Sequence, residues 1–284
     1  MSKLLFGTAG IPLSTPPATN GDLQTIKGIQ RVAELGLDCM ELEFVKQVYL
    51  SKTNAEKVEK FASDANIALS AHAPYALNFN AREAQKIRMS QSYLFSAAEV
   101  AYICGAKSVV FHPAYYVGDT SEQAYRTVKT ALAEVLEKME DKGIDITLRP
   151  EVSGKSSQFG TIAEVANLCS ELTNTMPCVD FAHWHARTGV YNSYKEFASV
   201  LDEISSILGK DALDNMHIHI SGIEYTANGE KRHLPFEDSD IKYMELLQVL
   251  KDYNVGGIVI CESPIMEEDA LLLKHSFDGL ALQG

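Results

Sequence analysis

The chain has 284 residues, which suits one large domain or two small ones, and its 46% hydrophobic and 22% charged residues are typical of a globular protein. No apolar stretch is long enough to span a bilayer, and the N-terminus lacks the apolar segment of a signal peptide, so we expect no membrane association. The net charge of −13 argues against broad non-specific binding to nucleic acid, although it leaves room for a basic patch on one face.

The cysteines are isolated in the sequence and form no Cys-x-x-Cys pair; they are Cys39, Cys104, Cys169, Cys178 and Cys261. An odd number of scattered cysteines fits the reducing cytoplasm, where we expect this protein to be located. We expect each of them to be a small, buried, apolar side chain.

Strand-like apolar runs alternate with helical patterns along the whole chain. The predicted strands cover residues 3–9, 39–45, 68–74, 108–114, 145–152, 177–183, 215–221 and 256–263. The predicted helices cover residues 22–35, 55–66, 80–105 and 120–142, a stretch from 161, residues 194–208 and 240–253, and a stretch from 263.

Several helix starts have recognisable caps. The patterns Thr120-Ser-Glu-Gln and Thr161-Ile-Ala-Glu are capping boxes. Asn80 is the expected N-cap of the third helix, and Ser263, followed by Pro264 at the first helical position, is the expected N-cap of the last.

Eight strand–helix units in a chain of this length predict an α/β fold, a closed (β/α)8 TIM barrel that forms a single domain over residues 1–284. An open doubly wound sheet is the alternative, but the turn after the first strand, FGTAGIP, does not fit the GxGxxG phosphate turn. The longest irregular stretches, 10–21, 114–119 and 223–239, should lie on the face where the strands end and should shape a substrate site.

Side chains that can bind a metal ion stand at the C-terminal ends of six consecutive predicted strands. They are His72, His112, Glu151, Asp180, His183, His217 and Glu262. In a barrel these ends meet in one ring, and unpaired carboxylates and imidazoles are costly to bury unless a cation pairs with them. One such histidine would usually be a satisfied core group, but seven residues of these types predict a metal site at the barrel mouth.

The number of candidate ligands favours more than one ion. Three carboxylates and four histidines exceed what one four-coordinate zinc needs, and a glutamate can bridge two ions. Nitrogen and oxygen ligands without a thiolate suit zinc or manganese, and the residues do not select between them.

In order along essentially the whole chain, the motifs resemble those of the endonuclease IV family of apurinic/apyrimidinic endonucleases, which belongs to the xylose isomerase-like TIM barrel superfamily. The motifs are His72-x-x-Tyr75, Phe111-His112-Pro113, Glu151-x-x-Gly154, Cys178-x-Asp180-x-x-His183, Met216-His217, His233 and Glu262-x-Pro264. The resemblance implies a trinuclear zinc enzyme. It implies a first zinc held by His72, His112 and Glu151, a second held by Glu151, Asp180, His217 and Glu262, and a third held by His183 and His233.

The chain departs from this family at the third site and in the DNA-contacting loops. The family has an aspartate two residues before its last histidine, where this chain has Lys231, so either Glu230 substitutes or the third site is altered. His185 and His219 are extra histidines near the mouth. The loop 45–49 also lacks the family's DNA-penetrating arginine. These departures bear on DNA specificity more than on metal binding.

Further polar and aromatic side chains have two readings each. Glu41 and Glu43 share one face of the second strand, and they either point into the mouth or pair with a basic residue such as Arg149. Tyr75 and Trp184 either stack on a base or sugar or pack in the core. The basic residues Lys46, Lys155, Lys231 and Arg232 either form a local phosphate patch or are merely solvated.

The leading hypothesis is a zinc-dependent phosphodiesterase of DNA base excision repair that cuts damaged double-stranded DNA on the 5′ side of abasic sites as a monomer. In it, Glu151 and Glu262 are the catalytic residues, and Tyr75, Lys155, Lys231 and Arg232 bind the substrate. It would hold two or three zinc ions, or manganese.

The second hypothesis is a single-metal sugar isomerase or epimerase of the same superfamily, with Glu151, Asp180, His217 and Glu262 as its ligands. A third is an inactive metal-binding scaffold. Metal stoichiometry separates the first two.

Overall fold

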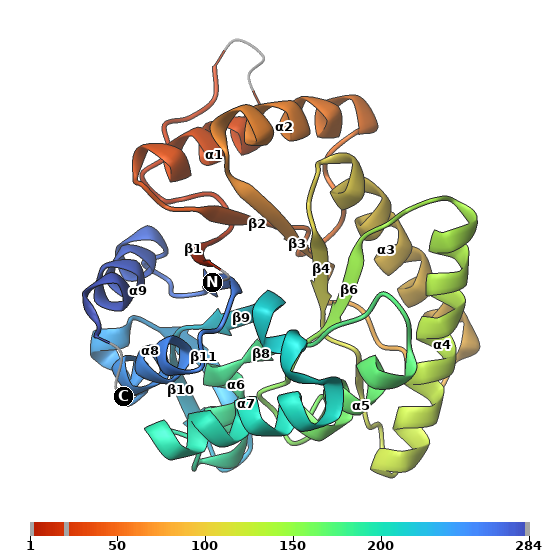
Figure 1. Ribbon diagram of the computed structural model, residues 1–284. Coiled ribbons are helices and arrows are strands. Elements are labelled where there is room, and N and C mark those ends of the chain that lie inside the picture. The colour runs from red at the N-terminus through yellow and green to blue at the C-terminus, as the bar shows by residue number, and fades with distance from the viewer. Residues whose placement is uncertain (1–2, 20–22, 282–284) are drawn as a thin grey trace.

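The computed structural model describes residues 3–19 and 23–281. The predicted start of the first helix at Asp22 and the end of the irregular stretch at Gly21 lie outside the described residues. Figure 1 looks along a ring of strands that is surrounded by helices.

Eight parallel strands form the barrel, in the spatial order β6-β4-β3-β2-β1-β12-β9-β8, which confirms the predicted (β/α)8 fold. The strands are β1 (Leu4–Ala9), β2 (Cys39–Glu43), β3 (Ala68–His72), β4 (Ser108–Phe111), β6 (Thr147–Pro150), β8 (Cys178–Asp180), β9 (Met216–Ile220) and β12 (Gly257–Cys261). Each lies within one of the eight predicted strands.

The seam between β6 and β8 closes the barrel without a continuous ladder. Two isolated parallel bridges, Leu148 with Thr175 and Glu151 with Cys178, join the two strands. Between them the buried Arg149 guanidinium donates to the carbonyl oxygens of Pro177 at 3.1 Å and Asn215 at 2.9 Å. The seam is therefore held by few backbone hydrogen bonds and one cation.

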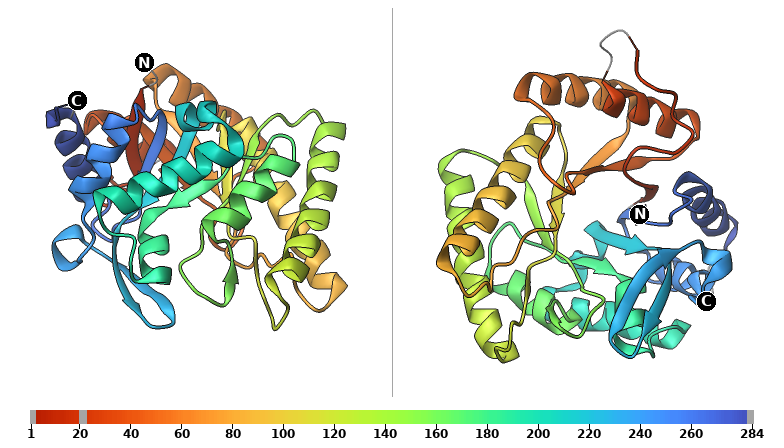
Figure 2. Two further views of the ribbon diagram at one scale, coloured as in Figure 1. Left: turned by 60° about the horizontal axis from the view of Figure 1, so that its bottom comes forward. Right: turned by 180° about the vertical axis from the view of Figure 1, so that it is seen from behind.

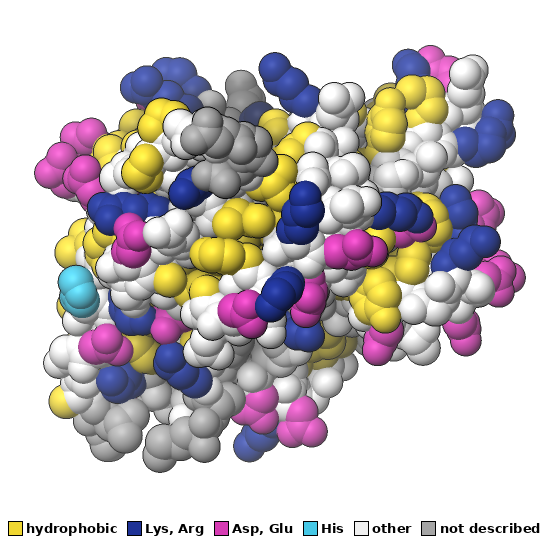
Figure 3. Space-filling view, turned by 90° about the horizontal axis from the view of Figure 1, so that it is seen from above, with side chains coloured by type: hydrophobic (Ala, Val, Ile, Leu, Met, Phe, Trp, Pro, Cys, Tyr) yellow, Lys and Arg dark blue, Asp and Glu magenta, His cyan; other side chains and the backbone are white. Residues whose placement is uncertain are grey.

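Helices surround this ring and pack their apolar faces on it. They are α1 (Gln24–Glu34), α2 (Lys52–Ala65), α3 (Ala84–Ile103), α4 (Ser121–Asp141), α5 (Ile162–Glu171), α6 (Phe181–Thr188), α7 (Tyr194–Leu208), α8 (Tyr243–Asp252) and α9 (Glu267–Gly279). None of the helices in the described ranges is long and apolar enough to cross a membrane. Figure 3 views the molecule from the side of α1 and α2 and shows acidic and basic side chains interspersed over that face.

Both predicted capping boxes are present, at Thr120 and at Thr161. The other two predicted caps are wrong. Helix α3 begins only after Glu83, because the Asn80 amide instead donates to the backbone carbonyls of Tyr115 and Tyr116. Residues 263–266 form a turn, so α9 begins at Glu267 rather than just after Ser263.

Three features at the mouth were not predicted. Helix α6 starts directly at the end of β8, because Asp180 caps it by accepting a hydrogen bond from the His183 backbone at 2.7 Å. Strands β5 (Ala114–Tyr115) and β7 (Gln158–Phe159) form one antiparallel pair. Strands β10 (Gly222–Thr226) and β11 (Gly229–Leu234) form a hairpin, followed by the short 3-10 helix η2 (Phe236–Asp238), where an irregular stretch was expected. The left view of Figure 2 shows this hairpin projecting from one end of the barrel.

The core has two parts of different chemistry. Apolar side chains fill the space between strands and helices, and the five cysteines are free and buried there or in the strands, as predicted. The inside of the barrel carries buried polar side chains, among them Glu41, Ser70 and His217. This polar interior leads directly up to the mouth.

Candidate metal centre

Glu151 is the centre of the polar mouth. It follows β6 directly, is fully buried, and both of its carboxylate oxygens face histidines from other parts of the barrel. Oε2 lies 3.3 Å from His72 Nε2 and 3.2 Å from His112 Nδ1. Oε1 lies 3.3 Å from both His183 Nδ1 and His219 Nδ1. One carboxylate therefore touches imidazoles from four different elements.

The structure brings together the three residues expected to hold the first ion: His72, His112 and Glu151 have ligand atoms within 4.8 Å of one another. His72 Nδ1 lies 2.7 Å from the carbonyl oxygen of Ala73, to which it donates. Nε2 is therefore the ring nitrogen that faces Glu151, and in the neutral ring its lone pair would be available to a metal ion.

A second group shares Glu151 and adds Asp180, His183 and Glu262. The resemblance placed His217 here, and the structure does not. His217 lies one layer deeper, with its Nε2 3.1 Å from Glu41 Oε2. His219 lies nearer to this group, since its Nδ1 is 3.3 Å from Glu262 Oε1 as well as from Glu151, and it also has ligand atoms close to those of Cys178 and His217.

The reason is the strand period. Residues 217 and 219 both face the barrel interior, and at about 3.3 Å per residue the later one stands roughly 6–7 Å nearer the mouth. The sequence held this signal, because His219 is the last inward-facing histidine of β9 (Met216–Ile220). We call Glu41, Ser70, Ser108 and His217, which lie beneath the mouth, the inner ring.

A third group consists of His183, Glu230 and His233. Glu230 therefore occupies the position for which the resemblance left open either substitution by Glu230 or an altered site. His183 Nε2 lies 3.4 Å from His233 Nε2 and 3.5 Å from Glu230 Oε2. In a regular strand, residues three apart face opposite sides. Here Tyr225 pairs with Glu230 and Glu224 pairs with Arg232, so Lys231 is the extra residue of a β-bulge. The bulge puts Glu230 and His233 on the same side.

The donor atoms of the mouth fit a cation. Among the described residues, Asp180 Oδ2, Glu262 Oε2 and His112 Nδ1 are buried and have no hydrogen-bond partner. Buried carboxylate oxygens without partners are costly, and a metal ion would satisfy them. Carboxylates and imidazoles together are ligands that zinc and manganese accept.

The charges of the mouth are strongly coupled. Burial lowers the pKa of His112 to about 4, so this imidazole is neutral and can bind a metal. Burial acts against the charge of Glu151 too, but His112, His183 and His219 outweigh it and hold the Glu151 pKa well below its usual range. Burial also raises the pKa of Glu43, at the edge of the mouth, to about 8.

Of the four residues expected to bind substrate, two line a cavity of about 400 Å³ above the centre: Tyr75 and Lys155. The Tyr75 ring lies beside those of His72 and His112, at centroid distances of 5.0 and 5.6 Å. Lys231 and Arg232 point away from the cavity and both pair with Glu224.

Two other candidates have structural partners. His185 Nε2 lies 3.2 Å from Asp240 Oδ1, and Trp184 packs against Tyr191 with ring centroids 5.3 Å apart. Neither lies with the three groups. Arg149 holds the seam rather than pairing with Glu41, whose carboxylate meets histidines instead.

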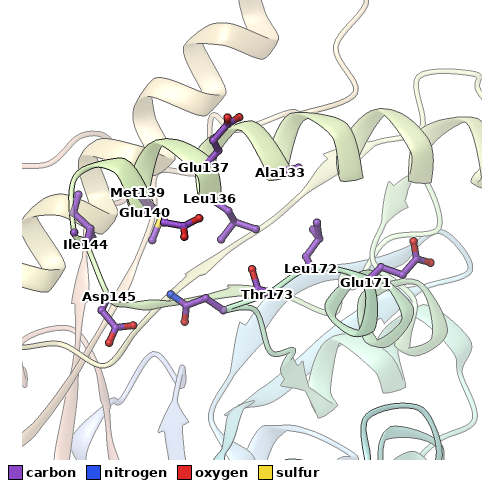
Figure 4. Close-up of a pocket in the computed structure, with 12 residues that line it drawn as sticks. Ala133, Leu136, Glu137, Met139, Glu140, Ile144, Asp145, Glu171, Leu172 and Thr173 are labelled. Atoms are coloured by element: carbon purple, nitrogen blue, oxygen red, sulfur yellow. The ribbon is translucent and has the colours of Figure 1, made fainter.

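A larger cavity of about 880 Å³ lies at the opposite end of the barrel, between the end of α4 and residues 171–174. Figure 4 shows its lining, where Leu136, Met139 and Leu172 are accompanied by carboxylates such as Glu137 and Glu140. Its lining contains no histidine and no cysteine among the described residues. Of these two cavities, the smaller one therefore carries the metal-binding chemistry.

Comparison with known proteins agrees with the barrel. The family model of the xylose isomerase-like TIM barrel matches residues 29–281. An uncharacterized protein of Methanocaldococcus jannaschii is 43% identical over 278 residues, covering 98% of each chain. A probable endonuclease 4 of Listeria monocytogenes serotype 4b is 29% identical over 210 residues, covering 72% of this chain and 69% of the relative.

Two solved structures have the same fold at low identity. Endonuclease IV from Thermus thermophilus has a TM-score of 0.74 and 19% identity, over 96% of this chain and 100% of the other. A D-tagatose 3-epimerase-like protein has a TM-score of 0.70 and 20% identity, over 89% and 91%. The fold alone therefore does not separate a nuclease from an epimerase.

Proposed function

The chain belongs to the xylose isomerase-like TIM barrel family, and within it we propose that the protein is a multi-metal phosphodiesterase that cuts DNA on the 5′ side of abasic sites. The observation that carries this proposal is the sharing of ligands between groups. Glu151 belongs to the first and second groups, and His183 belongs to the second and third. Shared ligands are what neighbouring ions require, whereas one ion would leave His72, His112 and His233 without a role.

Zinc or manganese bound by these groups would supply Lewis-acid stabilisation of charge on the phosphoryl oxygens. Glu151, held by four imidazoles, would keep the first two ligand groups at a fixed separation. The free Glu262 Oε2 would accept a proton of the attacking water and so orient it. Lys155 would bring a positive charge to the phosphate, and Tyr75 would pack against the sugar.

The size of the cavity supports a single flipped-out nucleotide as the group that enters it. About 400 Å³ holds one small ligand, not a stacked duplex. An abasic nucleotide leaves the helix at lower cost than a paired one, which would favour damaged DNA over intact DNA. We propose that the protein acts in this way as a cytoplasmic monomer, which light scattering of the purified protein tests.

The first experiment measures metal content per chain by elemental mass spectrometry, together with nicking of an oligonucleotide duplex with one synthetic abasic site. We expect two or three ions and a single nick 5′ to the site. His72→Ala should remove an ion and the nicking, and Lys231→Ala should change neither. Retention of several ions with no cleavage of any phosphodiester would contradict the phosphodiesterase.

A sugar epimerase is the second candidate, and one observation favours it. Lys231 and Arg232 are neutralised by Glu224, so the rim offers a DNA backbone few free cations on a chain of net charge −13. Glu151, Asp180, His219 and Glu262 would then hold one ion. A single ion that survives His72→Ala, together with conversion of a ketose to its epimer, would establish this candidate instead.

A further inference from the structure

We propose that Glu41 is a positioning residue, which orients His219 as a metal ligand through the contact of its carboxylate with the ring nitrogen that faces away from the mouth. This inference rests on the proposed metal centre. It concerns a residue of β2 (Cys39–Glu43) that belongs to none of the four groups of candidate ligands.

The Glu41 carboxylate lies between two imidazoles of β9. Its Oε1 is 3.0 Å from His219 Nε2, and its Oε2 is 3.1 Å from His217 Nε2. All three side chains are fully buried, at 0% exposure, so water does not compete for these contacts. Each oxygen of the carboxylate thus lies beside the Nε2 of a different histidine, and the two Nε2 atoms are 3.2 Å apart.

The carboxylate is itself held in place. Ser70 Oγ donates to Glu41 Oε2 at 2.6 Å, and His217 Nδ1 lies 3.1 Å from Ser108 Oγ. Because Ser70 belongs to β3 and the two histidines belong to β9, Glu41 cannot turn without losing contacts to both strands. The orientation it imposes on His219 is therefore fixed by the barrel.

The two nitrogens of His219 face different environments. Nε2 faces Glu41, while Nδ1 lies 3.3 Å from Glu151 Oε1 and from Glu262 Oε1. When Nε2 carries the proton on the side of Glu41, the neutral ring has its lone pair on Nδ1, toward the mouth. Metal-binding histidines commonly donate their second ring nitrogen to a carboxylate in this way, which fixes the tautomer and strengthens the ligand.

The test combines zinc affinity with a spectroscopic signature. Zinc binding is titrated against a chromogenic chelator for the wild type and Glu41→Gln, and imidazole nitrogen shifts are recorded by NMR on zinc-loaded wild type labelled with ¹⁵N-histidine. We expect the zinc that depends on His219 to bind about 10- to 100-fold more weakly in Glu41→Gln. In the wild type, His219 should show a metal-bound Nδ1 and a protonated Nε2.

A double-mutant cycle separates positioning from a general effect on the fold. If Glu41 acts through His219, Glu41→Gln should change the affinity by less than about twofold in a His219→Gln background. Ser108→Ala is the matched control, because it removes a buried hydrogen bond of the inner ring without touching His219. It should lower the melting temperature and leave zinc affinity unchanged.

The outcomes are distinct. Zinc binding by the wild type with equal affinity in Glu41→Gln would overturn the inference and leave the proposed function standing. A wild type that binds no zinc would overturn both. If Glu41→Gln does not fold, the NMR spectrum of the wild type still decides, since a proton on Nδ1 or zinc on Nε2 of His219 contradicts the inference.

Discussion

The mouth and the inner ring contain the same kinds of side chain and differ in where their partners come from. In the inner ring, Glu41 accepts a hydrogen bond from Ser70 and lies within 3.1 Å of His217 and His219, and His217 lies 3.1 Å from Ser108, so each side chain has a basic or hydroxyl partner close by within the protein. At the mouth, Glu262 Oε2 is a buried oxygen with no hydrogen-bond partner, and His233 Nδ1 is 4.0 Å away from it. A buried carboxylate or histidine in a barrel therefore indicates a metal ion only where the surrounding strands fail to supply its partner.

The largest loss of zinc affinity is expected from a substitution of Glu151, at the centre of the mouth. Glu151→Gln keeps the shape of the side chain but removes the charge shared by the first two groups. We expect zinc affinity at these sites to fall by at least about 100-fold, since loss of a ligand should exceed loss of a ligand's supporting bond. Metal analysis and calorimetric titration measure this, and an unchanged zinc content would remove Glu151 from the centre.

The bulge in β11 allows one group to be lost while the other two remain. Glu230→Ala should remove one ion per chain, because Glu230 belongs to the third group alone. Lys231→Ala, one residue away and turned toward Glu224, is the matched control and should keep every ion. If both variants lose the same ion, the bulge rather than the Glu230 carboxylate is responsible.

The β10–β11 hairpin packs closely against Gly154, and a substitution there should have a smaller effect on stability and on the third group. A Cβ on Gly154 would lie 2.8 Å from Glu230 Cβ and 3.1 Å from His183 Cδ2. Gly154→Ala should push the hairpin outward and destabilise the protein by about 1–3 kcal/mol. Chemical denaturation with and without zinc measures this; the third group should weaken, and an undisturbed third ion would show that the hairpin adapts.

The smallest effect concerns a carboxylate at the other end of the barrel that, like the inner ring, has partners within the protein. Asp38 accepts from Lys274, Lys3 and the Phe6 backbone, and these outweigh its burial and lower its pKa. Because the folded pKa is depressed, the stabilisation is present above the unfolded value of about 3.9 and is lost as pH falls through the folded pKa.

Asp38→Asn should therefore cost about 0.5–1 kcal/mol at pH 7, a modest amount because the ion pairs are partly solvated. The difference from the wild type should shrink as pH falls below about 3.9, and zinc content should not change. Urea denaturation at neutral and acidic pH measures it. A difference that stayed constant into the acid range would assign the effect to packing rather than charge.

The sequence predicted the eight strands and the residues at their ends because strong alternation of apolar runs and helical patterns leaves one arrangement of the chain. It did not separate His217 from His219, since both face inward and only the depth of the strand in the barrel distinguishes them. The bulge at Lys231 and the capping of α6 by Asp180 depend on hydrogen bonds to neighbouring elements, which one strand's pattern does not contain.

Metal binding at the mouth would also affect the seam between β6 and β8. Glu151 stands at the end of β6 and Asp180 at the end of β8, on either side of the place where the barrel has only two isolated bridges. An ion bound by both carboxylates would connect the ends of β6 and β8 and so stabilise the seam. Loading would then slow the exchange of amide hydrogens along β6 and β8, so the chemistry at the mouth and the closure of the barrel would be one event.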